Sequence, residues 1–329
     1  MSVLKPMRAE IAPMSQITND SPFWLGGAGL GNSITAISDD EARSTVETAW
    51  ALGVRAFDTA PHYGLGISEI RLGEVLSRMP RSEFTLSTKV GWVLEPGPGD
   101  GLDDQGFIVS NDRVRRYDAS ADGVHRSLDE SLGRLGLERV DVLYLHDPER
   151  VDLQAALRTA LPVMAELREA GLIDAVGIGS GSIEAHSAAL QTGLVDIAML
   201  SGRFTLLDQS GRPFLDDCAE AGVSVVAASV FNSGILSSTR PPDDAFFDYE
   251  PATVDVIDRA RVLADLSARY GVTLPQLAFA YAERHPAVSA VALGAQSPEH
   301  VSQNVANASV TIPSRLWRDV DAFIDSGSL

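Results

Sequence analysis

Residues 120–147 read SADGVHRSLDESLGRLGLERVDVLYLHD and combine a helical pattern with a strand pattern. In the first half, Val124, Leu128 and Leu132 recur at helical spacing, which predicts an amphipathic helix with one buried face. The second half holds the short apolar run Val140–His146, which predicts a buried strand that ends in a histidine. A helix that leads into a buried strand is the repeating unit of parallel α/β folds.

The same alternation of short apolar runs with amphipathic stretches extends along the chain. It predicts further strands at Val54–Thr59, Phe84–Lys89, Asp174–Gly179, Asp196–Leu200, Val223–Ala228 and Val288–Leu293, with the last one near Ala308–Ile312. Repeated strand–helix units imply parallel strands with right-handed crossovers, and a closed eight-stranded barrel fits better than an open sheet. We therefore expect residues 1–329 to form one domain, a single (β/α)8 barrel preceded by a short N-terminal hairpin.

Two long loops follow predicted strands at their carboxyl ends, where barrel enzymes place their sites. One spans Glu95–Gly106, and the other is TRPPDDAFFDYEP, which starts at Thr239. Loops of this length in compact domains are usually functional. Ser38 is predicted to cap a helix, because three acidic residues follow it in the first turn.

Composition excludes several classes of partner. The chain has 45 acidic and 26 basic residues and a net charge of −19, so we expect it to bind neither nucleic acid nor anionic membranes. Its one cysteine, Cys218, permits no internal disulfide and is predicted to lie buried in a helix. No signal sequence and no apolar run of about 20 residues is visible, which predicts a cytoplasmic protein.

Four polar or ionisable residues lie at or just after the ends of three consecutive predicted strands: Asp58, Tyr63, Lys89 and His146. In a barrel these ends converge on one mouth. A buried ammonium is costly unless it is paired, and Asp58 is the natural partner of Lys89. Taken singly, each residue has an ordinary structural role open to it, such as a helix cap or a packing contact. Their combination at one mouth favours a catalytic group.

The chemistry of this group fits hydride transfer to or from a carbon that carries oxygen. Oxidation of an alcohol requires the hydroxyl proton to leave, and Tyr63 is the candidate general acid/base. Because the pKa of tyrosine is ordinarily about 10, we expect Lys89 to favour the phenolate while Asp58 holds the ammonium in place. His146 would orient the substrate oxygen, and the hydride must go to a cofactor.

Several segments resemble the aldo-keto reductase superfamily. FDTAPHYGLGISEIRLGEVL at 57–76 is similar to its signature, STKVG at 87–91 to its lysine strand, and RSLDESLGRLGLERVDVLYLHDP at 126–148 to the segment that leads to its histidine. GRFTLLDQ at 202–209 and VVAASVFNSGIL at 225–236 most resemble the bacterial aldose 1-dehydrogenases, L-fucose dehydrogenases and pyridoxal 4-dehydrogenases of that superfamily. The resemblance implies a barrel that binds a nicotinamide cofactor, and it implies the four catalytic roles above. It also implies a monomer or a weak homo-oligomer.

Two segments are candidates for the dinucleotide site. The turn after the strand Val223–Ala228 has a Ser-Gly backbone that can approach pyrophosphate closely; its candidate contacts are Phe231, Ser233, Gly234 and Leu236. The second segment begins after Val288–Leu293 and opens a helix, with Ser297 as the predicted cap. There the candidates are Gly294, Gln296, Ser297 and His300, and the resemblance adds Gln303 and Asn304.

The segment Gly294–His300 departs from NADP-using relatives, which carry Arg or Lys there for the 2′-phosphate. It has neither, so we expect NAD in preference to NADP. Where many relatives hold the nicotinamide amide with Ser-Asn and Gln, this chain has Ser180 and Ser201. Phe231 is a candidate to stack on the nicotinamide ring. An NAD preference also favours the oxidative direction.

The substrate is a small molecule, and Trp92 and Phe247 are candidate pocket residues from the long loops. The expected reaction is NAD-dependent oxidation of a sugar at C1 to a lactone. Pyridoxal 4-dehydrogenation of a cyclic hemiacetal and NADPH-dependent carbonyl reduction are the enzymatic alternatives. A non-catalytic nucleotide-binding barrel is the alternative from another class. No metal site is expected, because His62, His146 and Asp147 form no clean ligand set.

Overall fold

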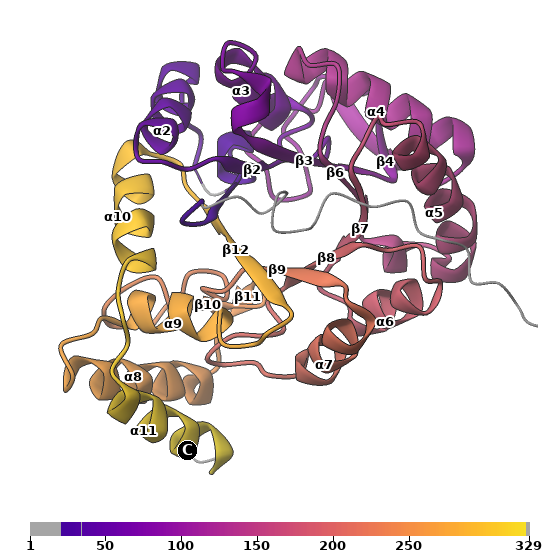
Figure 1. Cartoon of the computed structure of the whole chain (residues 1–329). Coiled ribbons are helices and arrows are strands. Elements are labelled where there is room, and N and C mark those ends of the chain that lie inside the picture. Colours follow the sequence, from indigo (N-terminus) through magenta and orange to yellow (C-terminus); the bar gives the residue numbers. More distant parts are fainter. Residues whose placement is uncertain (1–20, 34, 327–329) are drawn as a thin grey trace, which may run out of the picture.

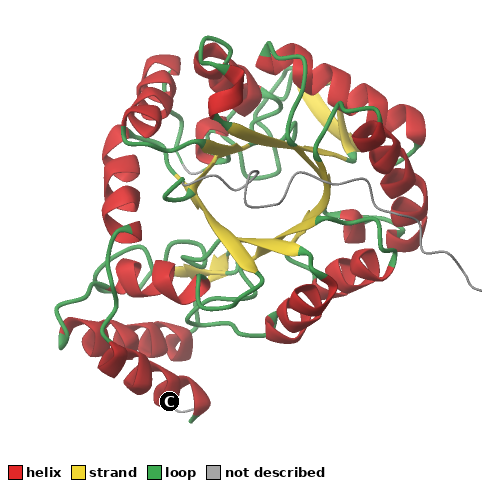
Figure 2. Ribbon diagram, viewed as in Figure 1, coloured by secondary structure: helices red, strands yellow, loops and turns green. Residues whose placement is uncertain are grey.

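Parallel strands close into a barrel in the computed structural model, which describes residues 21–33 and 35–326 (Figures 1 and 2). Figure 2 shows the strands as a closed ring with helices around it. In order around the ring, the strands are β1 (Trp24–Gly26), β12 (Val288–Gly294), β9 (Ser224–Ala228), β8 (Ile197–Ser201), β7 (Ala175–Ser180), β6 (Val142–His146), β3 (Thr85–Val90) and β2 (Ala56–Asp58). The predicted (β/α)8 barrel is confirmed.

The helices before residue 309 surround the strands in chain order, as the colours of Figure 1 show, whereas the last helix returns to pack on α8 (Val254–Ala268). They are α2 (Asp39–Ala51), α3 (Ile67–Leu76), α4 (Ala121–Leu135), α5 (Leu153–Glu169), α6 (Ile183–Gln191), α7 (Arg212–Ala221), α8 (Val254–Ala268), α9 (Leu274–Ala282), α10 (Pro298–Ala308) and α11 (Ser314–Asp325). Ser38 caps α2 through a capping box with Glu41, and Cys218 is buried in α7, both as predicted.

One strand prediction is wrong. Ala308 ends α10, and residues 309–313 connect it to α11 without joining the sheet. Ile312 is apolar because its side chain packs into the core between barrel and helices. The barrel is closed instead by β1, which pairs in parallel with both β12 and β2. The residues before Ser21, where most of the N-terminal hairpin is predicted, lie outside the described residues.

Along each strand, alternate side chains pack into two different cores, one inside the barrel and one between the barrel and the helices. On β6, Leu143 and Leu145 pack outward against the helices, whereas Val142 and Tyr144 face the barrel interior. His146 shares the inward parity of Val142 and Tyr144 and lies at the carboxyl end of the strand. This parity directs the last inward side chain of a strand to the barrel mouth.

The two long loops contain short strands. The predicted loop Glu95–Gly106 begins within an antiparallel hairpin made of β4 (Trp92–Pro96) and β5 (Arg113–Tyr117). The loop from Thr239 contains the two-residue strands β10 (Phe246–Phe247) and β11 (Glu250–Pro251). Both hairpins follow the carboxyl ends of barrel strands, namely β3 and β9. No helix within the described ranges is both long and apolar enough to span a bilayer.

Candidate active site

The inward parity of three neighbouring strands brings the predicted tetrad together. On β2, Ala56 faces the interior, so Asp58 does too, and on β3 the same alternation carries Lys89 inward. The register pairs Asp58 with Ser87 and Lys89 with Tyr144, which sets the two charged side chains at neighbouring levels of the barrel. The alternation of side chains along β2 and β3 therefore directs both Asp58 and Lys89 to the same part of the barrel interior.

Lys89 and Asp58 form a buried ion pair with its hydrogen bonds satisfied. The Lys89 ammonium donates to both carboxylate oxygens of Asp58, at 2.8 and 2.7 Å, and to the Thr59 carbonyl at 2.9 Å. The Ser87 hydroxyl donates to Asp58 Oδ1 at 2.7 Å. Lys89 and Asp58 are only 2% and 3% exposed, so water cannot replace either partner.

Tyr63 and His146 complete the group. The Lys89 Nζ atom lies 4.7 Å from the centre of the Tyr63 ring, over its face. The rings of Tyr63 and His146 are perpendicular, with their centres 5.9 Å apart. A phenol, an ammonium, a carboxylate and an imidazole therefore meet at the carboxyl end of the barrel, as the strand ends predict.

Burial, rather than the ammonium, dominates the acid–base state of this group. Desolvation, reinforced by the negative charge of Asp58, raises the pKa of Tyr63 well above its ordinary value. Burial therefore outweighs any lowering of the Tyr63 pKa by Lys89, and the net fall in that pKa expected from the sequence is not seen. Desolvation, followed by the charge of Lys89, lowers the pKa of His146 well below its ordinary value. At neutral pH the group holds a neutral phenol beside a neutral imidazole.

A close backbone contact holds the loop that carries Tyr63. A Cβ on Gly31 would lie 2.7 Å from the Tyr63 carbonyl carbon and 2.8 Å from Gly64 N. Gly64 itself has a φ of +62°, and a Cβ there would meet the Gly31 carbonyl oxygen at 2.4 Å. Both positions require glycine. The turn η1 (Gly29–Gly31) is thereby packed against the backbone of the tyrosine loop.

Arg115 of the β4–β5 hairpin also holds the loop that carries Tyr63. Arg115 donates to the His62 carbonyl from Nη2 at 2.7 Å and from Nε at 3.1 Å. Its guanidinium also pairs with Asp103 at 2.5 Å, and both side chains are almost fully buried. The sequence reasoning missed Arg115 and Asp103, because their pairing depends on a hairpin that the sequence does not reveal.

Of the two predicted substrate contacts, Trp92 lies beside the tetrad. Its ring centre is 5.7 Å from that of His62, and the His62 ring is in turn 5.5 Å from that of His146. Phe247, on β10, is half-buried and packs against the outer core. The structure thus brings Trp92 to the mouth next to His146.

The candidate nicotinamide contacts lie at the ends of adjacent strands. Ser180 ends β7, and its hydroxyl donates to Glu149 Oε1 at 2.5 Å. Ser201 ends β8 and shares a 2.8 Å hydrogen bond with the hydroxyl of Ser229. Both hydroxyls are at the barrel mouth, already engaged with neighbouring side chains.

The turn after β9 has the strained backbone typical of a ligand-binding loop. Ser229, Asn232 and Ser233 all have positive φ without being glycine. Asn232 is buried, and its Oδ1 atom has no hydrogen-bond partner among the described residues. Of the predicted contacts here, Ser233 and Gly234 are exposed, Phe231 is half-buried and Leu236 is buried. An exposed Ser-Gly backbone beside an unpartnered amide fits a polar ligand such as a dinucleotide.

The second predicted segment opens α10 as expected. Ser297 caps the helix by accepting from His300 N, and the His300 and Gln303 side chains are exposed. Two candidates instead make contacts within the protein: Gln296 donates to the Thr35 carbonyl at 3.1 Å, and Asn304 donates to the carbonyl of Gly294 at 3.1 Å. The free N–H groups of this helix start fit an anionic group.

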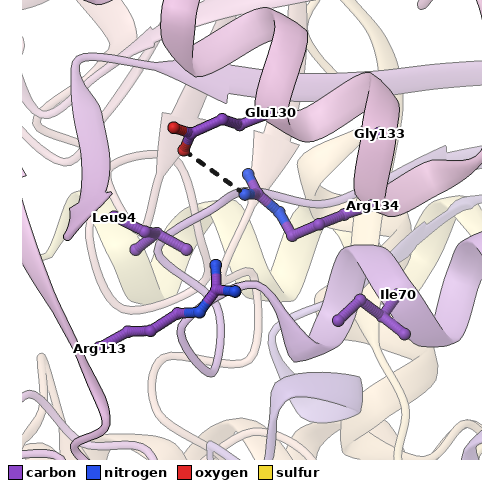
Figure 3. A pocket seen from close by; sticks show the side chains of 6 residues that line it. All are labelled: Ile70, Leu94, Arg113, Glu130, Gly133 and Arg134. Atoms are coloured by element: carbon purple, nitrogen blue, oxygen red, sulfur yellow. Dashed lines mark ion pairs between the residues drawn. The ribbon is translucent and has the colours of Figure 1, made fainter. Parts of the chain in front are cut away.

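A hollow of about 560 Å³ lies outside this site, against α3, α4 and the β4–β5 hairpin (Figure 3). Figure 3 shows its charged lining, with Arg134 directed toward Glu130. No tetrad residue lines it. Within the described part of the chain, no three His, Cys, Asp or Glu side chains form a group that could hold a metal ion.

Comparison with known proteins identifies the family. Residues 22–325 match the model of the aldo/keto reductase family. The chain belongs to this family. Its members use nicotinamide cofactors, and the chain is accordingly an oxidoreductase that acts on CH–OH groups of small molecules.

Two curated relatives are similar over nearly their whole length. D-threo-aldose 1-dehydrogenase from a Pseudomonas species is 42% identical, over 90% of this chain and 91% of the relative. Pyridoxal 4-dehydrogenase from Microbacterium luteolum is 36% identical, over 89% of this chain and 91% of the relative. Among solved structures, glycerol dehydrogenase from Gluconobacter oxydans shares the fold, with a TM-score of 0.72 and 20% identity, over 93% of this chain and 92% of that chain.

Proposed function

We propose that this aldo/keto reductase oxidises the C1 hydroxyl of a cyclic aldose to a lactone, with NAD as the cofactor and Tyr63 as the general acid/base. The observation that carries the proposal is the meeting of Tyr63, Lys89, Asp58 and His146 at one mouth. The 42% identity to a D-threo-aldose 1-dehydrogenase supports an aldose as substrate. The tetrad supports proton transfer at a carbon-bound oxygen.

The protein's part in the reaction is to hold the substrate and move one proton. His146 is kept neutral by burial and orients the C1 hydroxyl, while Tyr63 in its phenolate form takes the hydroxyl proton. Lys89, fixed by Asp58, places a positive charge over the tyrosine ring and stabilises that phenolate. A nicotinamide cofactor, when bound, accepts the hydride that leaves C1. The products are a lactone, the reduced cofactor and one proton.

The pattern of charges near α10 supports NAD over NADP. From Gly294 to His300 the chain has no Lys or Arg, Glu299 adds a negative charge, and the Gln296 amide is engaged with Thr35. A 2′-phosphate is a dianion that arginine binds through paired hydrogen bonds. His300→Arg is expected to raise kcat/KM with NADP by about tenfold while kcat/KM with NAD changes little. Equal use of both cofactors by the unmodified protein would contradict the preference.

Pyridoxal is the second candidate substrate, favoured by the 36% identity to pyridoxal 4-dehydrogenase. Its cyclic hemiacetal also yields a lactone, so the same proton transfer applies. A panel assay of the purified protein separates the candidates: L-fucose, D-arabinose, L-galactose and pyridoxal are offered with NAD or NADP while cofactor reduction is followed. We expect the highest kcat/KM with an aldose and NAD. A preference for pyridoxal, or activity only as an NADPH-dependent carbonyl reductase, would overturn the proposal.

A further inference from the structure

Five side chains around the tetrad each have a buried polar atom with no hydrogen-bond partner in the described part of the chain. The atoms are His62 Nδ1, Trp92 Nε1, the Tyr117 hydroxyl, His146 Nδ1 and Glu149 Oε2. Buried polar groups are nearly always paired, so a cluster of unpaired ones needs an explanation. A substrate that supplies the missing partners is one.

The four ring side chains of this group, those of His62, Trp92, Tyr117 and His146, form one continuous wall. The ring centre of His62 is 5.5 Å from that of His146 and 5.7 Å from that of Trp92. Trp92 in turn stands perpendicular to Tyr117, with the ring centres 4.9 Å apart. A Cβ on Gly91 would lie 3.1 Å from the Tyr117 ring, so that ring packs directly on the strand end that carries Trp92. The wall therefore runs from the tetrad to the β4–β5 hairpin.

Glu149 lies on η3 (Pro148–Arg150), the turn that follows β6 and its terminal His146, and its charge acts on Tyr117. The Ser180 hydroxyl holds one of its carboxylate oxygens at 2.5 Å and leaves Oε2 without a partner. Burial, and then the negative charges of Asp147 and Glu149, raise the pKa of Tyr117 above its ordinary value, so its hydroxyl stays protonated at neutral pH. Trp92, Tyr117 and Glu149 are each partly exposed, so the side chains that carry these polar atoms reach the surface.

The donors and acceptors match a neutral polyol. An indole N–H only donates, a carboxylate only accepts, and a phenol does both, which suits a row of hydroxyl groups. The aromatic faces suit the C–H surface of a sugar ring. Anions are disfavoured, because Arg150 and Arg115 at this mouth are already paired with Asp147 and Asp103.

We propose that Trp92, Tyr117 and Glu149 form a hydroxyl-binding subsite that selects neutral, polyhydroxylated substrates over phosphorylated or carboxylated ones. The proposal rests on the proposed function and adds to it the part of the substrate that lies away from C1. Tyr117 and Glu149 act here as specificity residues, and neither takes part in proton transfer.

The test measures binding apart from turnover. Calorimetry with saturating oxidised cofactor follows 1,5-anhydro-L-fucitol, which lacks the C1 hydroxyl and is not oxidised. Tyr117→Phe is expected to raise its Kd by about fivefold, and Glu149→Gln by tenfold or more, because the carboxylate carries a charge. Tyr270→Phe, at a partly exposed position, and Glu166→Gln, at an exposed one, are matched controls outside the wall, and both should leave the Kd unchanged. Thermal melting of all four variants checks that they fold.

L-Fucose 1-phosphate, a non-oxidisable anion, is the second probe. It should bind the unmodified protein at least tenfold more weakly than the anhydro sugar, and Glu149→Gln should narrow that gap. Equal binding of both probes, or an unchanged Kd for anhydrofucitol in folded Tyr117→Phe and Glu149→Gln variants, would overturn the subsite. A different result would mean that only the proposed function fails: Tyr117→Phe and Glu149→Gln weaken binding of the anhydro sugar as expected, but the unmodified protein oxidises no aldose.

Discussion

Tyr63 is a neutral phenol at neutral pH, because burial and the charge of Asp58 raise its pKa. Oxidation consumes the phenolate. As long as the pH is below the pKa of Tyr63, the phenolate fraction grows about tenfold for each unit by which the pH rises. The kcat/KM for oxidation is therefore expected to rise with pH between about 6 and 9 with a slope near one. Reduction consumes the phenol and should stay nearly flat over that range. His62, whose pKa burial lowers to about 2, adds no titration there.

Initial-rate measurements in both directions across this range check the prediction. Tyr270→Phe removes a partly exposed phenol that donates to Asp319 and takes no part in the tetrad, so it should show the same profile as the unmodified protein. An oxidation rate that falls with rising pH would contradict the assignment of Tyr63 as the base.

We expect the buried pair of Lys89 and Asp58 to support both stability and turnover. Asp58→Asn leaves the ammonium without its counter-charge and is expected to lower the free energy of unfolding by about 3–5 kcal/mol. Adding Lys89→Met removes the unpaired charge, so the double variant should regain part of that stability and none of the turnover. Urea denaturation and rate assays measure the two quantities. Recovery of turnover in the double variant would show that the pair is only structural.

At the scale of elements, the tyrosine loop depends on its contact with η1. Gly31→Ala places a methyl group 2.7 Å from the Tyr63 carbonyl carbon, so the backbone of Tyr63 and Gly64 must move. Displacement of Tyr63, the proposed general acid/base, by even about 1 Å is expected to lower turnover by roughly a hundredfold. Gly133→Ala on α4 is the control, since nothing lies within 4 Å of the added Cβ. It should retain turnover and gain up to about 1 kcal/mol of stability.

The sequence predicts most elements because their apolar runs alternate strictly between strand and helix. It predicts the tetrad because Asp58, Lys89 and His146 end their strands. The sequence does not reveal β1, because Trp24–Gly26 is too short to show a pattern. It wrongly predicts a strand at residues 308–312, whose apolar side chains pack against the core without joining the sheet. It also misses Tyr117 and Arg115, whose positions depend on how the β4–β5 hairpin folds back over the mouth.

In the molecule as a whole, the barrel is closed by β1, which is only three residues long. Trp24 is fully buried and fills the interior beside Tyr144, on a strand that joins β12 to β2. Trp24→Ala is expected to lower the free energy of unfolding by about 3–5 kcal/mol and to lower the melting temperature. Val262→Ala, at a partly exposed position on α8, should change it by less than about 0.5 kcal/mol. Equal stability of the two variants would mean that β1 adds little to barrel closure.

The central claim is that Tyr63 transfers the proton at a mouth where cofactor and substrate meet. Its most direct test is Tyr63→Phe, assayed for aldose-dependent NAD reduction and, by fluorescence titration, for NADH binding. We expect a loss of turnover of at least about a hundredfold, with an NADH Kd within about twofold of that of the unmodified protein. Turnover retained within tenfold, with the variant folded and the cofactor bound, would contradict it.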